Sequence, residues 1–207
     1  MISPTQSKIW RINIMKNSVT NTNPCKVVTG IARLSYANIW TAKSINGGTP
    51  KYSTSVLIPK SDTATVQKIK AAIQAAYEEG ESKLKGNGKS VPSIAALKTP
   101  LRDGDVERPD DEAYAGHWFV NANSNTAPGV VDINRQPISE TSEIYSGVYA
   151  RVSLSFYAFN SNGNRGIACG LQNIQKIKDG ESLGGKVRAE DDFNDEFTTD
   201  VDEDFLA

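Results

Sequence analysis

Aromatic and basic side chains alternate with apolar ones over residues 148–159, and such side chains can bind unpaired nucleic acid. Every second residue is apolar: Val148, Ala150, Val152, Leu154, Phe156 and Ala158. The other face presents Tyr149, Arg151, Ser153, Ser155, Tyr157 and Phe159. Single-stranded bases stack on aromatic rings, at about 1–3 kcal/mol per base, while Arg and Lys follow the phosphates. A strand buried on both faces has the same pattern, so the segment alone favours neither interpretation.

Aromatic and basic residues on other predicted strands extend this pattern. Because a Trp or Tyr taken alone is more often a core or rim residue, the hypothesis of a shared groove rests on their spread over several strands. The rings of this set would stack on bases, and its basic side chains would contact phosphates. The residues expected to bind single-stranded DNA are Tyr36, Trp40, Lys51, Tyr52, Arg102, Trp118, Tyr149, Arg151, Tyr157, Phe159, Arg165 and Lys176.

Few residues of this chain could form a catalytic site. His117 is the single histidine, which argues against histidine-based metal sites and hydrolytic triads. The acidic cluster 103–112 could hold Mg²⁺ as in a two-metal nuclease, but its DGD and PDDE runs are more typical of turns. No glycine motif for nucleotide phosphates is present. We therefore expect no catalytic residue, metal or cofactor, and keep two alternatives: a Mg²⁺-dependent nuclease and a protein-binding structural module.

Opposite charges lie far apart in this sequence. Residues 190–207 hold nine acidic side chains and no Lys or Arg. The whole chain has 23 basic and 24 acidic side chains, so residues 1–189 keep 15 acidic ones and a net charge of +8. Such charge asymmetry within one chain indicates a nucleic-acid or membrane partner. No apolar run approaches the roughly 20 residues that a membrane-spanning helix needs. We predict a basic body and an acidic tail over 188–207 that is disordered when unbound.

The predicted elements form a mainly β domain with appendages. Residues 1–25 are expected to be a flexible arm, and residues 26–187 the folded domain. Apolar residues at helical spacing predict one α-helix over about 62–79. Five or six strands are expected, the last two joined by an Asn-Gly turn, with a long surface loop over 97–117. This pattern fits a five-stranded Greek-key barrel of the OB-fold type, which binds oligonucleotides.

Several segments resemble a family of single-stranded-DNA-binding proteins from tailed bacteriophages. The similar segments cover about residues 26–197 and occur in the family's order. They read KYSTSVLIPKSDTATVQKIKAAI, LKTPLRDGDVERPDDEAYAGHWFVNANS, PGVVDINRQPI, YSGVYARVSLSFYAFNSNGNRGIACGLQNIQKIKDGESLGG and AEDDF. The resemblance implies an OB-fold, sequence-tolerant binding of single-stranded DNA in phage replication or recombination, no catalytic activity, and a place in the cytoplasm of the infected bacterium.

The resemblance also suggests a role for the acidic tail. Proteins of this type commonly end in acidic tails, and a tethered polyanion competes with DNA for a cationic groove. Once displaced, the tail would recruit phage or host replication proteins such as a polymerase or helicase. The tail residues expected to act are Asp191, Asp192, Phe193, Asp195, Glu196, Phe197, Asp202, Glu203, Asp204 and Phe205. Such tails often end on an aromatic residue, whereas Leu206 and Ala207 follow Phe205 here. The oligomeric state stays open between a monomer and a homodimer.

Overall fold

Five long strands close into a barrel. The computed structural model describes residues 23–44, 47–161 and 164–184 of the chain. The barrel strands are β2 (Ala32–Lys43), β3 (Lys51–Pro59), β5 (His117–Ser124), β7 (Tyr149–Ser161) and β8 (Asn164–Lys178). They pair in the closed order β2–β3–β5–β8–β7–β2, antiparallel except for β5–β8. This arrangement confirms the predicted five-stranded barrel of the OB-fold type.

Short elements extend the barrel at its edges. They are β1 (Lys26–Val28), α3 (Glu81–Lys85), η1 (Ile94–Ala96), β4 (Leu101–Asp103), α4 (Gly104–Glu107), η2 (Glu112–Tyr114), β6 (Gly129–Val131) and η3 (Thr141–Glu143). Strand β1 pairs with β7, β4 with β5, and β6 with β8. The segment predicted as a long irregular loop over 97–117 therefore contains a strand and two short helices.

Helix α2 (Thr63–Glu79) confirms the predicted helix over 62–79. Asp62 caps its start, since the carboxylate accepts a hydrogen bond from the backbone N–H of Thr65 at 3.0 Å. The buried face repeats at helical spacing: Thr65, Val66, Ile69, Ala72, Ile73 and Ala76. The helix ends at Gly80, where a side chain would collide with Ala158 of β7. Glycine therefore lets the helix end pack directly against the barrel.

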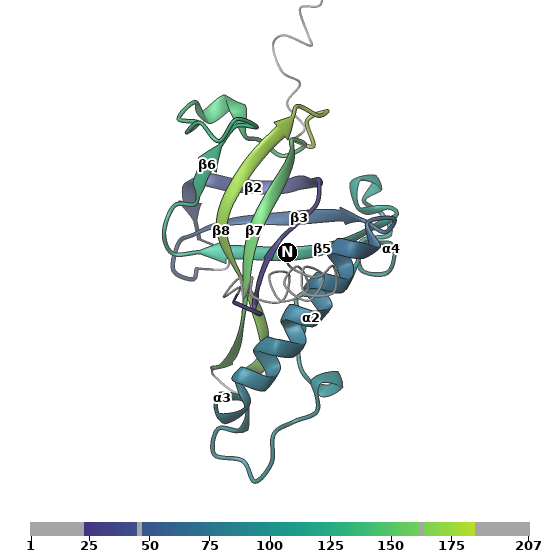
Figure 1. Ribbon diagram of the computed structural model, residues 1–207, viewed down its shortest axis with the longest axis vertical. Coiled ribbons are helices and arrows are strands. Elements are labelled where there is room, and N and C mark those ends of the chain that lie inside the picture. The colour runs from purple at the N-terminus through teal and green to yellow at the C-terminus, as the bar shows by residue number, and fades with distance from the viewer. Residues whose placement is uncertain (1–22, 45–46, 162–163, 185–207) are drawn as a thin grey trace, which may run out of the picture.

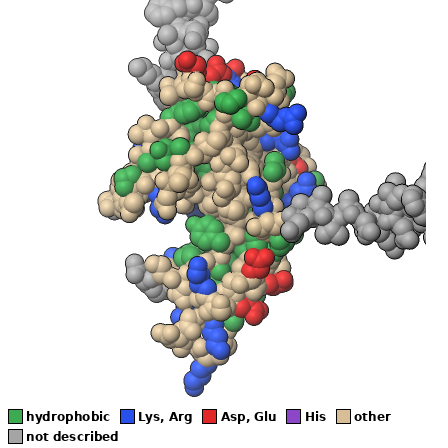
Figure 2. Space-filling model, turned by 60° about the vertical axis from the view of Figure 1, so that its left-hand side comes forward, with side chains coloured by type: hydrophobic (Ala, Val, Ile, Leu, Met, Phe, Trp, Pro, Cys, Tyr) green, Lys and Arg blue, Asp and Glu red, His purple; other side chains and the backbone are tan. Residues whose placement is uncertain are grey.

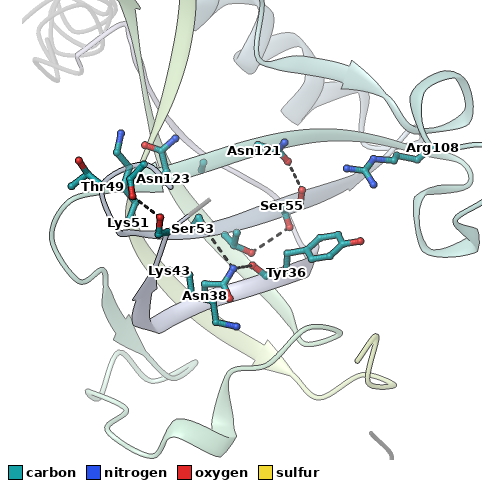
Figure 3. Close-up of a pocket in the computed structure, with 14 residues that line it drawn as sticks. Tyr36, Asn38, Lys43, Thr49, Lys51, Ser53, Ser55, Arg108, Asn121 and Asn123 are labelled. Atoms are coloured by element: carbon teal, nitrogen blue, oxygen red, sulfur yellow. Dashed lines mark hydrogen bonds between the residues drawn. The ribbon is translucent and has the colours of Figure 1, made fainter. Parts of the chain in front are cut away.

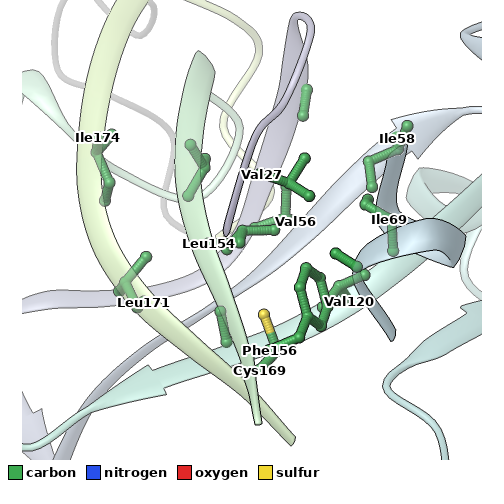
Figure 4. Packing of buried hydrophobic residues seen from close by; sticks show 14 of the residues in the cluster. Val27, Val56, Ile58, Ile69, Val120, Leu154, Phe156, Cys169, Leu171 and Ile174 are labelled. Carbon is green, nitrogen blue, oxygen red and sulfur yellow. The ribbon is translucent and has the colours of Figure 1, made fainter. Parts of the chain in front are cut away.

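The hydrophobic core lies inside the barrel and under α2. The apolar face predicted for β7 is confirmed, because Val148, Ala150, Val152, Leu154, Phe156 and Ala158 are all buried. Figure 4 shows Leu154 and Phe156 packing with Val56, Val120 and Ile69, which come from two other strands and from α2. The core also buries two free cysteines; burial, and secondarily Glu79, raises the pKa of Cys25 to about 11.

The strands form two groups that cross each other in Figure 1. Strands β2, β3 and β5 run across the view, whereas the long β7–β8 hairpin runs from top to bottom and ends beside α3. Arg165 near the hairpin turn donates to the carbonyl oxygens of Leu84 and Lys85 at 3.3 and 3.4 Å. Within the described residues, no helix has the length and apolar character needed to cross a membrane. Residues 1–22 of the predicted arm over 1–25 and the predicted acidic tail over 188–207 lie outside the described residues. The end of the predicted arm belongs to the folded body, because Cys25 is buried in the core and accepts a hydrogen bond from the Phe156 N–H.

Candidate nucleic-acid interface

A groove of about 780 Å³ runs over the outer face of β2, β3 and β5. Strand alternation decides which side chains reach it. On β3, Val56 and Ile58 point into the barrel core while Ser53 and Ser55 face the groove. On β5, Asn121 and Asn123 face the groove, opposite Ser55 and Ser53 respectively. Two neighbouring strands thus present hydroxyls and amides side by side.

Tyr36 contributes an exposed ring to the groove. Its backbone has φ of 48°, and the pairing of β2 with β3 shifts register between Ser35 and Asn38. A positive φ is uncommon for a bulky residue, and a bulge of this kind redirects the side chain. The Tyr36 side chain is 57% exposed, and the Asn38 amide donates to the Tyr36 carbonyl oxygen at 3.1 Å. The bulge therefore places an aromatic face in solvent at the groove.

Three basic side chains stand at the ends of the groove. Lys43 and Lys51 are exposed and lie directly opposite each other on β2 and β3. Like charges paired across strands are unfavourable, so this pair favours a bound anion. Arg108 lies toward the other end, on the same side of the view as Tyr36, and Lys51 and Asn123 lie at the first end (Figure 3). No Asp or Glu is among the described residues that line the groove.

The wall that carries Arg108 is fixed by a small hydrophobic cluster. Tyr114 is fully buried against Leu57 and Phe119, and the two rings meet edge to face at 5.0 Å between centroids. These contacts hold residues 104–116 over the outer face of β3 and β5. The Arg108 guanidinium lies 5.6 Å from the Tyr114 ring centroid. A segment expected to be irregular therefore positions one of the three groove cations.

The structure places two of the sequence-predicted residues, Tyr36 and Lys51, in the groove. Sequence reasoning missed the other polar and basic groove residues: Asn38, Lys43, Ser44, Thr49, Ser53, Thr54, Ser55, Arg108, Asn121 and Asn123. A signal for part of this set was present, because the runs KYSTS and NANS put polar residues at every second position of two strands. That alternation predicts an exposed polar face on the two strands, but it does not indicate a nucleic-acid ligand.

The other predicted rings lie away from the groove. Trp40 packs against the core and donates through Nε1 to the Ile144 carbonyl oxygen at 3.2 Å. Trp118 is half-buried beside α2, with Lys60 and Lys70 near its ring at 5.4 and 5.6 Å. Tyr149 is half-buried with Lys178 at 4.6 Å from its centroid. The remaining rings are Tyr52 and Phe159, which are half-buried, and Tyr157, which is 44% exposed.

The other predicted basic residues bond to the protein itself. Arg102 pairs with Glu107 at 2.9 Å and lies 4.4 Å from the centroid of the Phe119 ring. Arg151 donates through Nε to the Thr29 carbonyl oxygen at 3.2 Å. Arg165 binds the end of α3, as described above.

Lys176 pairs with two carboxylates, Glu143 and Asp179. Burial of the ammonium group acts to lower its pKa, but the hydrogen bonds to both carboxylates outweigh burial and raise the pKa. Lys and Arg side chains are otherwise spread from the upper body to the tip of the lower projection on the face drawn in Figure 2. The groove is therefore identified by its local charges and shape.

The acidic cluster 103–112 has structural contacts. Asp103 and Asp105 both contact Lys60 Nζ, at 2.6 and 2.7 Å. The Lys60 hydrogen bond lowers the pKa of Asp105 and the two carboxylates raise the pKa of Lys60. Asp111 accepts a hydrogen bond from the Ala113 N–H at the start of η2. In the part of the chain that the structure describes, no three His, Cys, Asp or Glu side chains are grouped to hold a metal ion.

Known proteins share this sequence and architecture. A family model described as the Enterobacter phage Enc34 ssDNA-binding protein matches residues 25–206. The protein p50 of Acyrthosiphon pisum secondary endosymbiont phage 1 is 31% identical over 179 residues, which are 82% of this chain and 93% of that protein.

Solved structures agree with the fold. The single-stranded DNA-binding protein from bacteriophage Enc34, in complex with ssDNA, is 26% identical with a TM-score of 0.61. That match covers 77% of this chain and 90% of the Enc34 chain. The gp2.5 protein of bacteriophage T7, a single-stranded DNA binding protein, matches with a TM-score of 0.56 over 79% of this chain and 97% of its own. At 15% identity, the T7 match supports the fold alone.

Proposed function

Because the chain belongs to the family of phage Enc34-type single-stranded-DNA-binding proteins, we propose that the groove over β2, β3 and β5 is its DNA site. The observation that carries this proposal is the groove's composition. Cations stand at both ends, an exposed ring lies toward the Arg108 end, and no carboxylate is among the described lining residues. A polyanion with unpaired bases matches this arrangement.

The proposed mechanism is sequence-tolerant, non-enzymatic binding. Phosphates contact Lys43, Lys51 and Arg108, and one base stacks on Tyr36. Binding releases the counterions of the contacted phosphates, so the affinity depends on salt. The biological setting that we propose is phage replication or recombination, in which the protein covers exposed single strands.

The acidic tail is proposed to compete with DNA for this groove. The last described residues support the idea, because Leu183 packs against the cluster of Leu57, Tyr114 and Phe119. That cluster holds the wall that carries Arg108, so the last described residues lie close to this wall. A tethered acidic segment there has an effective concentration of order millimolar. DNA binding would displace the tail and make it available to phage or host replication proteins such as a polymerase or helicase.

Titration of fluorescent oligo-dT at several salt concentrations tests the groove. With three phosphate contacts, the logarithm of the association constant falls against the logarithm of salt concentration with a slope of about −2. Lys51→Ala should weaken binding and flatten this slope by about 0.7.

Lys68→Ala is the matched control, because Lys68 is an exposed lysine on α2 and does not line the groove. Its salt slope should equal that of the unmodified protein. Equal slopes for Lys51→Ala and the unmodified protein would place the phosphates elsewhere. If oligo-dT did not bind at low salt, the DNA site itself would be refuted.

A further inference from the structure

The floor of the groove is made of amides and hydroxyls rather than rings. Among the described residues that line it, Tyr36 supplies the one aromatic ring. The neutral side chains of the floor are Asn38, Ser53, Ser55 and Asn121, which lie between the cationic ends, and Asn123, which lies at the same end as Lys51. Stacking on Tyr36 accounts for one base, so any other base in the groove faces neutral hydrogen-bonding groups.

The internal hydrogen bonds of the floor leave defined atoms for a ligand. The Ser55 hydroxyl donates to Asn121 Oδ1, which leaves the Nδ2 hydrogens of Asn121 as donors. Asn38 Nδ2 donates to the Tyr36 carbonyl oxygen and to Ser53 Oγ, which leaves Asn38 Oδ1 as an acceptor. The Asn123 amide makes no side-chain hydrogen bond within the described part of the chain, so it offers a donor and an acceptor together.

The charges decide which part of a nucleotide meets this floor. Phosphates are attracted to Lys43 and Lys51 at one end and to Arg108 at the other. The floor between them carries no formal charge, and it has both donors and acceptors. Phosphate oxygens only accept hydrogen bonds, whereas a base edge both donates and accepts. The floor therefore matches base edges better than it matches phosphates.

We propose that Asn121 and Asn123 hydrogen-bond the Watson–Crick edges of bases turned into the groove. The proposal rests on the groove being the DNA site. Each of the four bases has a donor next to an acceptor on that edge. The Asn123 amide presents the complementary pair, and the Nδ2 hydrogens of Asn121 add a donor for a base acceptor. The two amides can thus bind any of the four bases. The groove contacts the base edges without discriminating between sequences.

A chemically blocked base separates edge contacts from stacking. Binding of oligo-dT is compared with binding of an equally long oligomer of N3-methylthymidine, which keeps the charge and the π-face but lacks the N3–H donor. We expect the methylated oligomer to bind about fivefold or more weakly, the equivalent of about one lost hydrogen bond. Equal affinity of the two oligomers would overturn the proposal and leave the DNA site intact. Failure of both to bind would instead refute the DNA site.

Variants then assign the contacts. Combining Asn121→Ala with Asn123→Ala should bring the affinity ratio of the two oligomers close to one, while salt-dependent binding persists. Tyr36→Ala is the control, because loss of a stacking ring weakens both oligomers and leaves their ratio unchanged. An unchanged ratio in the double variant, with its circular dichroism intact, would refute the role of the two amides. If the double variant does not fold, the comparison of the two oligomers on the unmodified protein still decides.

Discussion

Tyr36 combines an unfavourable backbone with an exposed ring. A left-handed conformation costs an L-residue roughly 1–2 kcal/mol, and glycine avoids that cost. At φ of 48° and 57% exposure, the Tyr36 side chain gains little from packing that could offset it. Local strain of this kind clusters at ligand sites. The position is therefore suited to binding rather than to stability.

Tyr36→Gly should separate these two roles. We expect the free energy of unfolding in urea to stay equal or to rise by about 1 kcal/mol, because glycine relieves the backbone cost. Affinity for oligo-dT should fall by about 1–3 kcal/mol, the contribution of one stacked base. Tyr36→Ala is the comparison variant, since it removes the ring but keeps the unfavourable φ. If Tyr36→Gly destabilised the fold and left DNA binding unchanged, the ring would be structural.

The residues of the groove could be predicted only in part from the sequence. Tyr36 and Lys51 were predicted because aromatic and basic residues are the usual signals of nucleic-acid binding. Asn121 and Asn123 carry no such signal, and their role depends on the register of β5 with β3. Arg108 could not be predicted from the sequence for a different reason. It belongs to a loop whose position depends on the burial of Tyr114 against Phe119, a tertiary contact.

At the scale of elements, α2 stabilises the barrel from the side away from the groove. It packs against the core through Ile69 and its neighbours on the same face, and none of its residues line the groove. Asp62→Ala removes the hydrogen bond to the Thr65 N–H at the start of the helix. We expect a loss of about 1 kcal/mol in the free energy of unfolding, measured with urea. Oligo-dT affinity should not change.

Ser61→Ala provides a matched control for the helix cap. Ser61 is exposed and precedes Asp62, which is the residue that caps α2. Its replacement should leave both stability and DNA affinity unchanged. A fall in DNA affinity for Asp62→Ala, measured where the protein is fully folded, would mean that α2 and the groove are coupled.

Elements with a clear hydrophobic period were the predictable ones. The helical spacing of α2 and the apolar face of β7 both appear in the structure as the sequence predicts. The second face of β7 could not be assigned, because its surroundings differ along the strand. Ser153 is buried where β1 pairs with β7, while Tyr157 further along the strand is 44% exposed. One alternating pattern therefore contains both buried and open positions.

At the scale of the whole molecule, a body of charge +8 over residues 1–189 is joined to a segment with nine acidic side chains. Deletion of residues 190–207 should tighten oligo-dT binding at low salt, because it removes the proposed tethered competitor. The effective concentration of the tethered tail is of order millimolar. A tail that binds the groove with a millimolar dissociation constant therefore weakens the apparent DNA affinity about twofold, and a tail with a lower dissociation constant weakens it more. Fluorescence titration of the intact and shortened chains at two salt concentrations measures the effect.

A second variant separates charge from tethering. Replacing the nine acidic side chains of 190–207 by their amides keeps the length of the chain and removes the charge that we propose competes with DNA. The amide variant should bind oligo-dT as tightly as the shortened chain, and both should converge with the intact protein at high salt, where charge interactions are screened. If the amide variant behaved like the intact protein, the tail would act by bulk rather than by charge. If deletion left the affinity unchanged at every salt concentration, the tail would not occupy the groove, and its charge would serve contacts with other proteins alone.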